Sequence, residues 1–382
     1  MGTPSVSAKP SSTPRYVMIG GFLGAGKTTA VAKLARRLTD QGLRVGLITN
    51  DQGRNLVDTA MLRAGGFATE EIPGGCFCCR FNSLVEASKN LSVKTSPDVF
   101  IAEPVGSCTD LVATVTSPLR RLYGKDFRIA PLSVLVDPVR ARRIFGLDKG
   151  GKFSEKVLYI YQKQLEEADI IVISKSDLLD KTQLEELRDA IAGKYPEAEV
   201  IMASSRAETN LDQWFNRITS AEHPTRATME VDYDIYAEGE ALLGWLNCTV
   251  QLKTKKTFNA EKFLKKLASE IQKHLRGKKA EIAHLKMTLS REPGAKDIAV
   301  ANLVRNDFVP EVSLNLRSAV GRAQLIINLR AEAAPDILGQ AVREGLAVAA
   351  RGFPTLKPTL DHLEHFRPGR PTPTHRDLRP KK

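Results

Sequence analysis

The sequence predicts an α/β domain with a mostly parallel sheet, followed by a smaller α+β domain and a Pro-, His- and Arg-rich tail. Three observations lead to this prediction. Short apolar runs alternate with helical stretches over residues 15–215, which is typical of parallel strands joined by helices. From residue 243 the strands alternate apolar and polar residues instead, as in an antiparallel sheet. After Gly352, prolines, histidines and arginines become frequent.

These changes of pattern divide the chain into four segments. We expect a disordered leader over 1–14, a first domain over 15–220, a second domain over 233–352 and an extended tail over 353–382. Between the two domains, at 221–232, the alternation of strands and helices stops. No apolar run reaches the ~20 residues that a membrane helix needs, so no membrane partner is expected.

The compartment is predicted from the N-terminus and the cysteines. The first residues lack the apolar core of a secretory signal. The chain has five cysteines, and their uneven placement suits a reducing environment better than a disulfide framework. We therefore expect a cytoplasmic protein.

Each element of the first domain follows from a local pattern. Apolar runs rich in β-branched residues, bounded by turns, predict buried parallel strands. The predicted strands are 15–22, 43–51, 97–104, 130–138, 168–177 and 198–205. The predicted helices are 27–41, 154–167, 182–195 and 210–219.

The second domain is expected to be a half-exposed antiparallel sheet with helices on one face. Its predicted strands are 243–253, 281–291, 297–306, 311–318 and 322–331. Its predicted helices are 259–276 and 335–350. For the tail, we expect an extended segment with one helical turn near 359–366.

The net charge of +12 is concentrated in places, with ten Lys or Arg against two Glu over residues 253–279. Such a stretch can bind nucleic acid or an acidic partner. A solvated helix face is the favoured interpretation, because apolar residues repeat at helical spacing along the same stretch and no aromatic stacking platform lies nearby. This apolar stripe consists of Phe263, Leu264, Leu267, Ile271 and Leu275.

A phosphate-binding loop is predicted where the first strand meets the first helix. The segment from Gly21 to Thr28 reads G-x-x-x-x-G-K-T, and its glycines let backbone N–H groups turn toward phosphates. Lys27 can reach the β- and γ-phosphates, and the Thr28 hydroxyl can bind Mg²⁺. This motif predicts a P-loop nucleoside triphosphatase domain. The predicted nucleotide contacts of the loop are Gly21, Gly24, Ala25, Gly26, Lys27, Thr28 and Thr29.

A second motif indicates which base is bound. Residues 174–177 read Ser-Lys-Ser-Asp at the end of a predicted strand, where P-loop GTPases carry Asn-Lys-x-Asp. The Asp177 carboxylate can accept both hydrogen bonds that guanine offers, and the Lys175 stem can lie along the base. Ser174 stands in the Asn position, and Ser204 follows the next strand, where a backbone N–H can reach guanine O6. GTP is therefore favoured over ATP.

Three of the five cysteines, Cys76, Cys78 and Cys79, fall within four positions after two glycines. Cysteines so close together form disulfides only with strain. Thiolates at this spacing can converge on one Zn²⁺, Co²⁺ or Ni²⁺ ion. A buried or redox-labile cluster is the alternative. Cys108 could supply a fourth thiolate, although a small buried cysteine is the favoured interpretation there.

In order and spacing, several stretches resemble the CobW-like metal-chaperone GTPases, relatives of the nickel-enzyme maturation GTPases. After the phosphate loop come LITNDQGRNLVDTAML, EIPGGCFCC, FIAEPVGS, VLVDP and QLEEADIIVISKSDLL, and the similarity covers about residues 15–180. The chain resembles a divergent branch of the family. It carries Arg54 where an acidic residue is frequent, Ser174 where Asn is usual, and Glu-Pro-Val-Gly where Glu-Thr-Ser-Gly is more usual.

The resemblance implies roles for individual residues. Glu103 and Gly106 would lie at the γ-phosphate, with Glu103 orienting the attacking water or holding Mg²⁺ through water. Asp51 would lie in a mobile segment near Mg²⁺ and the phosphates. With Lys27, these acids would form the catalytic group. The three clustered cysteines would be the metal ligands, with Zn²⁺ the favoured ion and Co²⁺ or Ni²⁺ as alternatives.

Two classes of function follow. The first is a metallochaperone that hydrolyses GTP and passes a divalent ion to a client metalloprotein. Its intrinsic rate of GTP hydrolysis is expected to be slow. The second is a P-loop nucleoside triphosphatase that serves as an assembly or regulatory factor for a cofactor enzyme or a nucleic acid. In this second class the cysteines are structural or redox-active and the basic second domain binds the partner.

Overall fold

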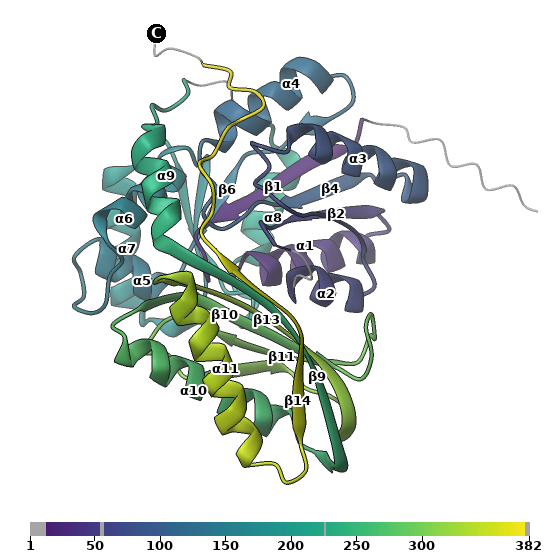
Figure 1. The fold of residues 1–382 in the computed structure, drawn as a ribbon. Coiled ribbons are helices and arrows are strands. Elements are labelled where there is room, and N and C mark those ends of the chain that lie inside the picture. The colour runs from purple at the N-terminus through teal and green to yellow at the C-terminus, as the bar shows by residue number, and fades with distance from the viewer. Residues whose placement is uncertain (1–12, 54–56, 225–226, 379–382) are drawn as a thin grey trace, which may run out of the picture.

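The computed structural model describes residues 13–53, 57–224 and 227–378. The expected disordered leader lies almost wholly outside these residues, and so does Arg54. Two sheets, each accompanied by helices, lie against one another (Figure 1). Among the described residues, no helix combines the length and the apolar content needed to cross a membrane.

The first sheet is parallel and follows the strand order β3-β2-β4-β1-β6-β7-β8, with β5 beside β1. Every residue of β1, β2, β4, β6 and β7 is buried, which explains why these strands read as continuous apolar runs. The predicted α/β fold with a mostly parallel sheet is confirmed. The strands are β1 Arg15–Gly21, β2 Val45–Asn50, β3 Ala68–Ile72, β4 Val99–Glu103, β5 Arg128–Ile129, β6 Ser133–Val136, β7 Ile170–Ile173 and β8 Glu199–Met202.

Helices connect these strands and cover the sheet. The four predicted helices correspond to α1, α6, α7 and α8, whereas α2 to α5 are additional. Two of the additional helices, α4 and α5, are short and begin with a proline in the first turn. The helices are α1 Lys27–Asp40, α2 Val57–Ala64, α3 Phe81–Thr95, α4 Ser117–Tyr123, α5 Pro138–Ile144, α6 Glu155–Glu166, α7 Lys181–Lys194 and α8 Leu211–Ser220.

The second sheet is antiparallel, with the strand order β12-β11-β10-β13-β9-β14. Helix α9 leads into it, and α10 and α11 pack on one of its faces (Figure 1). The whole apolar stripe of the basic helix is buried in this core, so the stripe faces the sheet as expected. The elements are α9 Tyr233–Leu242, β9 Leu243–Phe258, α10 Ala260–Gly277, β10 Glu281–Ser290, β11 Ile298–Leu303, β12 Glu311–Leu314, β13 Val320–Glu332, α11 Pro335–Arg351 and β14 Lys357–Phe366.

The other face of this sheet, expected to be half-exposed, lies instead against the first domain. Side chains alternate along each strand, so Leu285 and Met287 of β10 join the core under α10 and α11. Lys286 between them reaches Asp58 of the first domain. Likewise Arg330 of β13 is fully buried and reaches Asp51. The polar alternation therefore marks a charged interface between the two halves.

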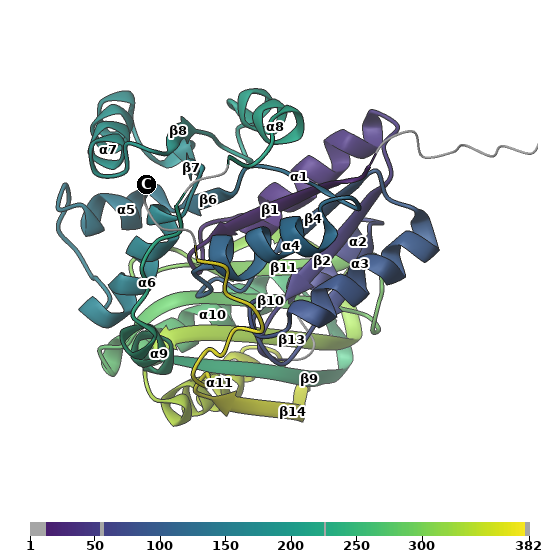
Figure 2. The ribbon, with the colours of Figure 1, turned by 90° about the horizontal axis from the view of Figure 1, so that it is seen from above.

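The segment after Gly352 also differs from the expectation of an extended tail with one helical turn. Residues Lys357–Phe366 form β14, which pairs antiparallel with β9 at the edge of the second sheet (Figure 2). Pro358 is compatible with this position, because an edge strand leaves one side of its backbone unpaired. Beyond Phe366 the chain has no regular structure as far as Leu378, and it crosses back over the first domain.

Candidate nucleotide and metal site

The phosphate loop joins β1 to α1 in the conformation that its glycines permit. Gly21 has a φ of 126°, and a Cβ atom there would lie 2.3 Å from the carbonyl oxygen of Leu135. Gly26, with a φ of 94°, precedes the first residue of α1. The buried Lys27 ammonium donates to the carbonyl oxygen of Gly21 at 2.8 Å. Burial lowers the pKa of Lys27 to about 8, against the opposing charge of Glu103.

Three oxygen-bearing side chains meet at the start of α1. The Thr28 hydroxyl lies 2.8 Å from Asp58 Oδ1 and 2.9 Å from Glu103 Oε1. Burial, followed by the neighbouring Asp58, raises the pKa of Glu103 to about 7. Hydroxyl and carboxylate oxygens are the protein ligands that Mg²⁺ prefers, so this donor set fits Mg²⁺. Asp58 was not singled out from the sequence, although it is the Asp that ends the LITNDQGRNLVD stretch.

Two cations from the second sheet complete this region. The Lys286 ammonium lies 2.6 and 2.8 Å from the Asp58 carboxylate oxygens and 3.3 Å from Thr28 Oγ1. Arg330 donates to both oxygens of Asp51, at 3.0 and 3.2 Å. The structure thus brings Asp58, rather than Asp51, into contact with Thr28. The only signal for either cation in the sequence is a charged residue inside an apolar strand.

The predicted base-reading residues gather beside the phosphate loop. Lys175 has a φ of 49° and donates to the Gly24 carbonyl at 2.7 Å and to Asp137 at 2.8 Å. The Ser204 hydroxyl donates to Asp177. Ser174 donates to the carbonyl oxygens of Ala25 and Val136, at 2.7 and 2.8 Å. The hydroxyl of Ser174 therefore holds the phosphate loop, and the base-reading groups that remain are Lys175 and Asp177.

Gly106 follows β4 and touches the phosphate loop. A Cβ atom at this position would lie 2.7 Å from a methyl group of Leu23 and 3.0 Å from its backbone nitrogen. A glycine therefore allows the loop after Glu103 to approach the phosphate loop closely. Thr29, in the first turn of α1, is exposed in this arrangement.

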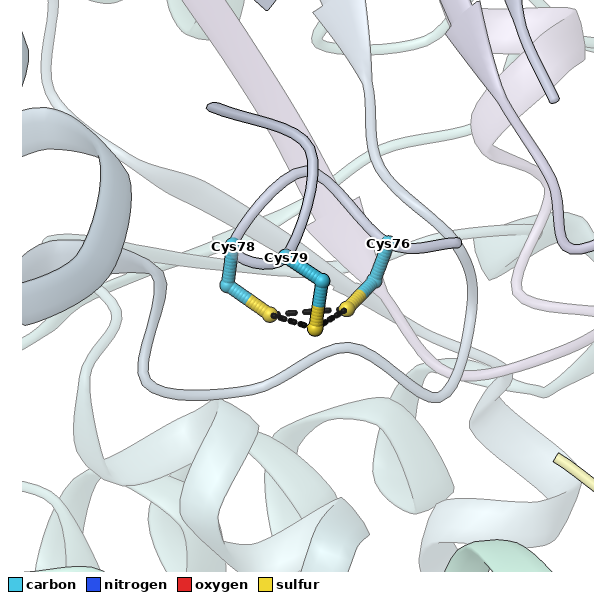
Figure 3. Close-up of side chains that lie close together, drawn as sticks. All are labelled: Cys76, Cys78 and Cys79. Carbon is cyan, nitrogen blue, oxygen red and sulfur yellow. Dashed lines mark hydrogen bonds between the residues drawn. The ribbon is translucent and has the colours of Figure 1, made fainter. Parts of the chain in front are cut away.

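The three clustered cysteines converge in one loop between β3 and α3 (Figure 3). Their sulfur atoms lie 2.7 Å (Cys76 to Cys78), 3.2 Å (Cys76 to Cys79) and 3.7 Å (Cys78 to Cys79) apart. Within the described part of the chain, these thiols are the one group of three or more His, Cys or acidic ligands close enough to hold a metal ion. Cys76 and Cys78 are buried and Cys79 is partly exposed, so the site fits a soft divalent ion.

A side chain at the end of β2 holds the cysteine loop. The amide of Asn50 donates to the carbonyl oxygens of Ile72 and Gly75, at 2.9 and 2.6 Å. The backbone N–H groups of Cys79 and Arg80 close a turn on the carbonyl of Cys76. Asn50 immediately precedes Asp51, so the loop is attached to the stretch that leads to Asp58.

Residues 370–377 of the C-terminal segment lie across the cysteine loop, and we call them the strap. The backbone N–H of Thr372 donates to Cys79 Sγ at 3.2 Å, and that of Thr374 donates to the Cys78 carbonyl at 2.8 Å. Arg376 donates to the buried Asp110 at 2.8 Å. The strap partly covers the side of the cluster on which Cys79 is exposed.

The fold and the site define a class of protein. A glycine-rich loop at the carboxyl end of a parallel sheet, leading into a helix with Lys-Thr, belongs to nucleotide-binding proteins of the P-loop type. Residues 15–202 match the family model described as CobW/HypB/UreG, nucleotide-binding domain.

Curated relatives match over the same region. The chain is 31% identical to the zinc chaperone YeiR of Escherichia coli (strain K12) over 166 residues. This match covers 43% of this chain and 47% of that protein. The chain is 29% identical to the zinc chaperone CobW of Sinorhizobium sp over 204 residues. This match covers 46% of this chain and 55% of that protein. The chain thus spans about half the length of the curated relatives that it matches.

Among solved structures, the chain is similar to the Zn(II)-bound YjiA GTPase from E. coli. That similarity has a TM-score of 0.36 at 17% identity and covers 89% of this chain and 99% of the other.

Proposed function

We propose that this protein is a GTP-hydrolysing metallochaperone. It binds a divalent ion, Zn²⁺ before Co²⁺ or Ni²⁺, through Cys76, Cys78 and Cys79, and passes the ion to a client protein. The single observation that carries the proposal is the position of Asn50. Its side chain holds the cysteine loop at Gly75, and the stretch that begins beside it leads to Asp58 in contact with Thr28.

The nucleotide part of the proposal assigns roles to residues in contact. Lys27 neutralises charge on the β- and γ-phosphates, and Asp177 and Lys175 select guanine. Thr28 and Asp58 would hold Mg²⁺, which would supply positive charge at the phosphates. Glu103 positions the attacking water, and its raised pKa suits a group that exchanges a proton near neutral pH.

The metal part of the proposal rests on the chemistry of the thiols and on the relatives, two of which are named zinc chaperones. Three thiolates bind Zn²⁺ well. The cysteine loop is attached to the nucleotide-contacting stretch, so its conformation changes when that stretch reorders around the phosphates. Nucleotide state would then set how tightly the ion is held, which is what a delivery protein requires.

The experiment is a competitive titration of the reduced protein with Zn²⁺, Co²⁺ and Ni²⁺, with and without Mg²⁺ and a non-hydrolysable GTP analogue. A Cys76/Cys78/Cys79→Ser triple variant is compared with Cys248→Ser, which removes a buried thiol of β9. One-to-one binding that needs the clustered thiols and changes with nucleotide supports the proposal. Binding that is indifferent to both would reject it and turn attention to partners of the basic helix α10.

A second measurement checks the enzymatic part. Phosphate release from GTP is followed for the wild type and for Lys27→Ala, with and without Zn²⁺. We expect slow hydrolysis that the variant abolishes. Equal rates in both proteins would show that the phosphate loop does not carry out hydrolysis.

A further inference from the structure

A fourth thiol lies against the cluster of three. Cys108, in the loop after β4, is 1% exposed. Its thiol forms hydrogen bonds with the thiols of both Cys76 and Cys78. The fourth thiol thus comes from a separate segment of the chain and meets the two buried members of the cluster.

The backbone around Cys108 is fixed in this position. The Cys108 N–H donates to the Val105 carbonyl at 2.9 Å, which closes a turn. The Gln164 amide, from α6, donates to the carbonyl oxygens of Gly106 and Cys108, at 3.0 and 2.9 Å. Glu167, which follows α6, accepts from the Val112 N–H at 3.0 Å. The fourth thiol is therefore held before any ion arrives, and a preorganised ligand lowers the cost of binding.

One backbone donor reaches the cluster. The Thr372 N–H donates to the sulfur of Cys79, and such donors stabilise thiolate charge. Burial raises the pKa of the nearby Glu240 to about 7, so this carboxyl group adds little negative charge below that pH.

We propose that Cys108 is a metal ligand and completes a Cys₄ site with Cys76, Cys78 and Cys79. This inference rests on the proposed function, because it takes the ion to be the cargo described above. Zn²⁺ in closed sites is four-coordinate and tetrahedral, and three loop thiolates leave one position for the buried thiol. Each thiol that binds releases its proton to solvent, and four thiolates with one Zn²⁺ leave a net charge of −2.

The fourth ligand also links the metal to the nucleotide. Cys108 lies two residues after Gly106, which packs on the phosphate loop at Leu23, and five after Glu103, which contacts Thr28. When the loop that carries Glu103, Gly106 and Cys108 shifts around the γ-phosphate, Cys108 moves with it, and the ion loses one of its four ligands. The ion then changes from a closed site to an open, three-thiolate site, from which transfer to a client is easier.

The test is zinc K-edge X-ray absorption on the reduced protein loaded with one Zn²⁺, together with a zinc competition titration. We expect four sulfur neighbours at ~2.3 Å in the wild type and in the control Cys248→Ser. In Cys108→Ser we expect three sulfur atoms and one oxygen or nitrogen at ~2.0–2.1 Å, with zinc affinity reduced about tenfold or more.

The sulfur count of the wild type decides the matter even if Cys108→Ser does not fold. Three sulfur neighbours in the wild type, with zinc affinity unchanged in Cys108→Ser, would overturn the role of Cys108 and leave the metallochaperone proposal standing. A wild type that binds no zinc would overturn both.

Discussion

The ammonium group of Lys286 in β10 lies between the two carboxylate oxygens of Asp58 in α2, at 2.6 and 2.8 Å. The two side chains are 18% and 20% exposed and come from different sheets. Burial raises the pKa of Asp58, but the charge and hydrogen bond of Lys286, with smaller contributions from Thr28 and Lys27, together lower it below its ordinary value, so the carboxyl group stays ionised. A lysine of the second domain thus neutralises the Asp58 carboxylate, which contacts Thr28 at the start of α1.

Lys286→Met should therefore destabilise the nucleotide-free protein. It leaves Asp58 and Glu103 close together without their nearest cation, and we expect the free energy of unfolding to fall by about 2–3 kcal/mol, somewhat less than for a fully buried pair. The double variant Lys286→Met/Asp58→Asn should recover part of this loss. Urea denaturation measures both effects. Lys256→Met, which removes an exposed lysine of β9, should change stability by no more than about 0.5 kcal/mol. A Lys286→Met protein as stable as this control would contradict the expectation.

The base-reading role predicts a change of nucleotide preference in Asp177→Asn. The carboxylate accepts two hydrogen bonds from guanine, whereas an amide can accept one and donate one, which matches xanthine. We expect GTP to bind roughly 100-fold more weakly and XTP to gain affinity, since a hydrogen-bond donor that meets another donor loses its partner. Competition against a fluorescent nucleotide measures both affinities.

Asp180→Asn is the matched control for this change. Asp180 caps α7 three residues further on, and Asn caps helices equally well. Its nucleotide preference should equal that of the wild type. If Asp177→Asn also kept the wild-type preference, the assignment of Asp177 to guanine would be wrong.

Removing the strap should speed the loss of the metal. A chain that ends at Gly369 lacks the Thr372 and Thr374 contacts over the cysteine loop, so a chelator reaches Cys79 without prior opening of the strap. We expect zinc release to a chromogenic chelator about tenfold faster than in the wild type. A chain that ends at Leu378 keeps all the contacts described and serves as the control. Equal release rates in both shortened chains would show that the strap does not limit access.

Glu167 should make stability depend on pH. Burial raises its pKa to about 8 in the folded protein, against an ordinary value of about 4.3 in the unfolded chain. The folded state therefore holds this proton more tightly, and the stabilisation is complete below about pH 4.3 and is lost as the pH rises toward 8. The slope is at most about 1.4 kcal/mol per pH unit.

In Glu167→Gln this contribution disappears, so its free energy of unfolding should fall less steeply than that of the wild type between pH 5 and pH 8. Urea denaturation at several pH values gives the slopes. Glu166→Gln changes the adjacent residue, whose side chain is 46% exposed, and should keep the wild-type slope. Parallel curves for all three proteins would rule out a buried, protonated Glu167.

The sequence predicts those parts of the site that lie within one stretch of chain. The strand, the glycine loop and Lys27 are contiguous, and Cys76, Cys78 and Cys79 share one loop. Lys286 and Arg330 could not be placed, because they reach the site only through the pairing of β10 with β13 and the packing of the second sheet on the first. Contacts that depend on such packing leave no local pattern.

The same reasoning explains two differences in the second domain. Alternating polar residues on a sheet indicate a face that is not part of an apolar core, but they do not distinguish water from a charged neighbour. The charges of β10 and β13 meet carboxylates of the first domain. Residues 357–366 contain Pro358, which lacks a backbone donor and is therefore confined to edge strands within sheets, and β14 is an edge strand.

The contact between the two sheets has a consequence for how the protein denatures. Lys286 and Arg330 of the second sheet are partners of Asp58 and Asp51 in the first domain, and the two halves cannot separate without breaking both ion pairs and exposing the interface around them. Heating should therefore melt both halves in a single calorimetric transition. A fragment that stops near residue 220 would be a less stable protein with a more acidic face, and its nucleotide affinity would not represent that of the whole chain.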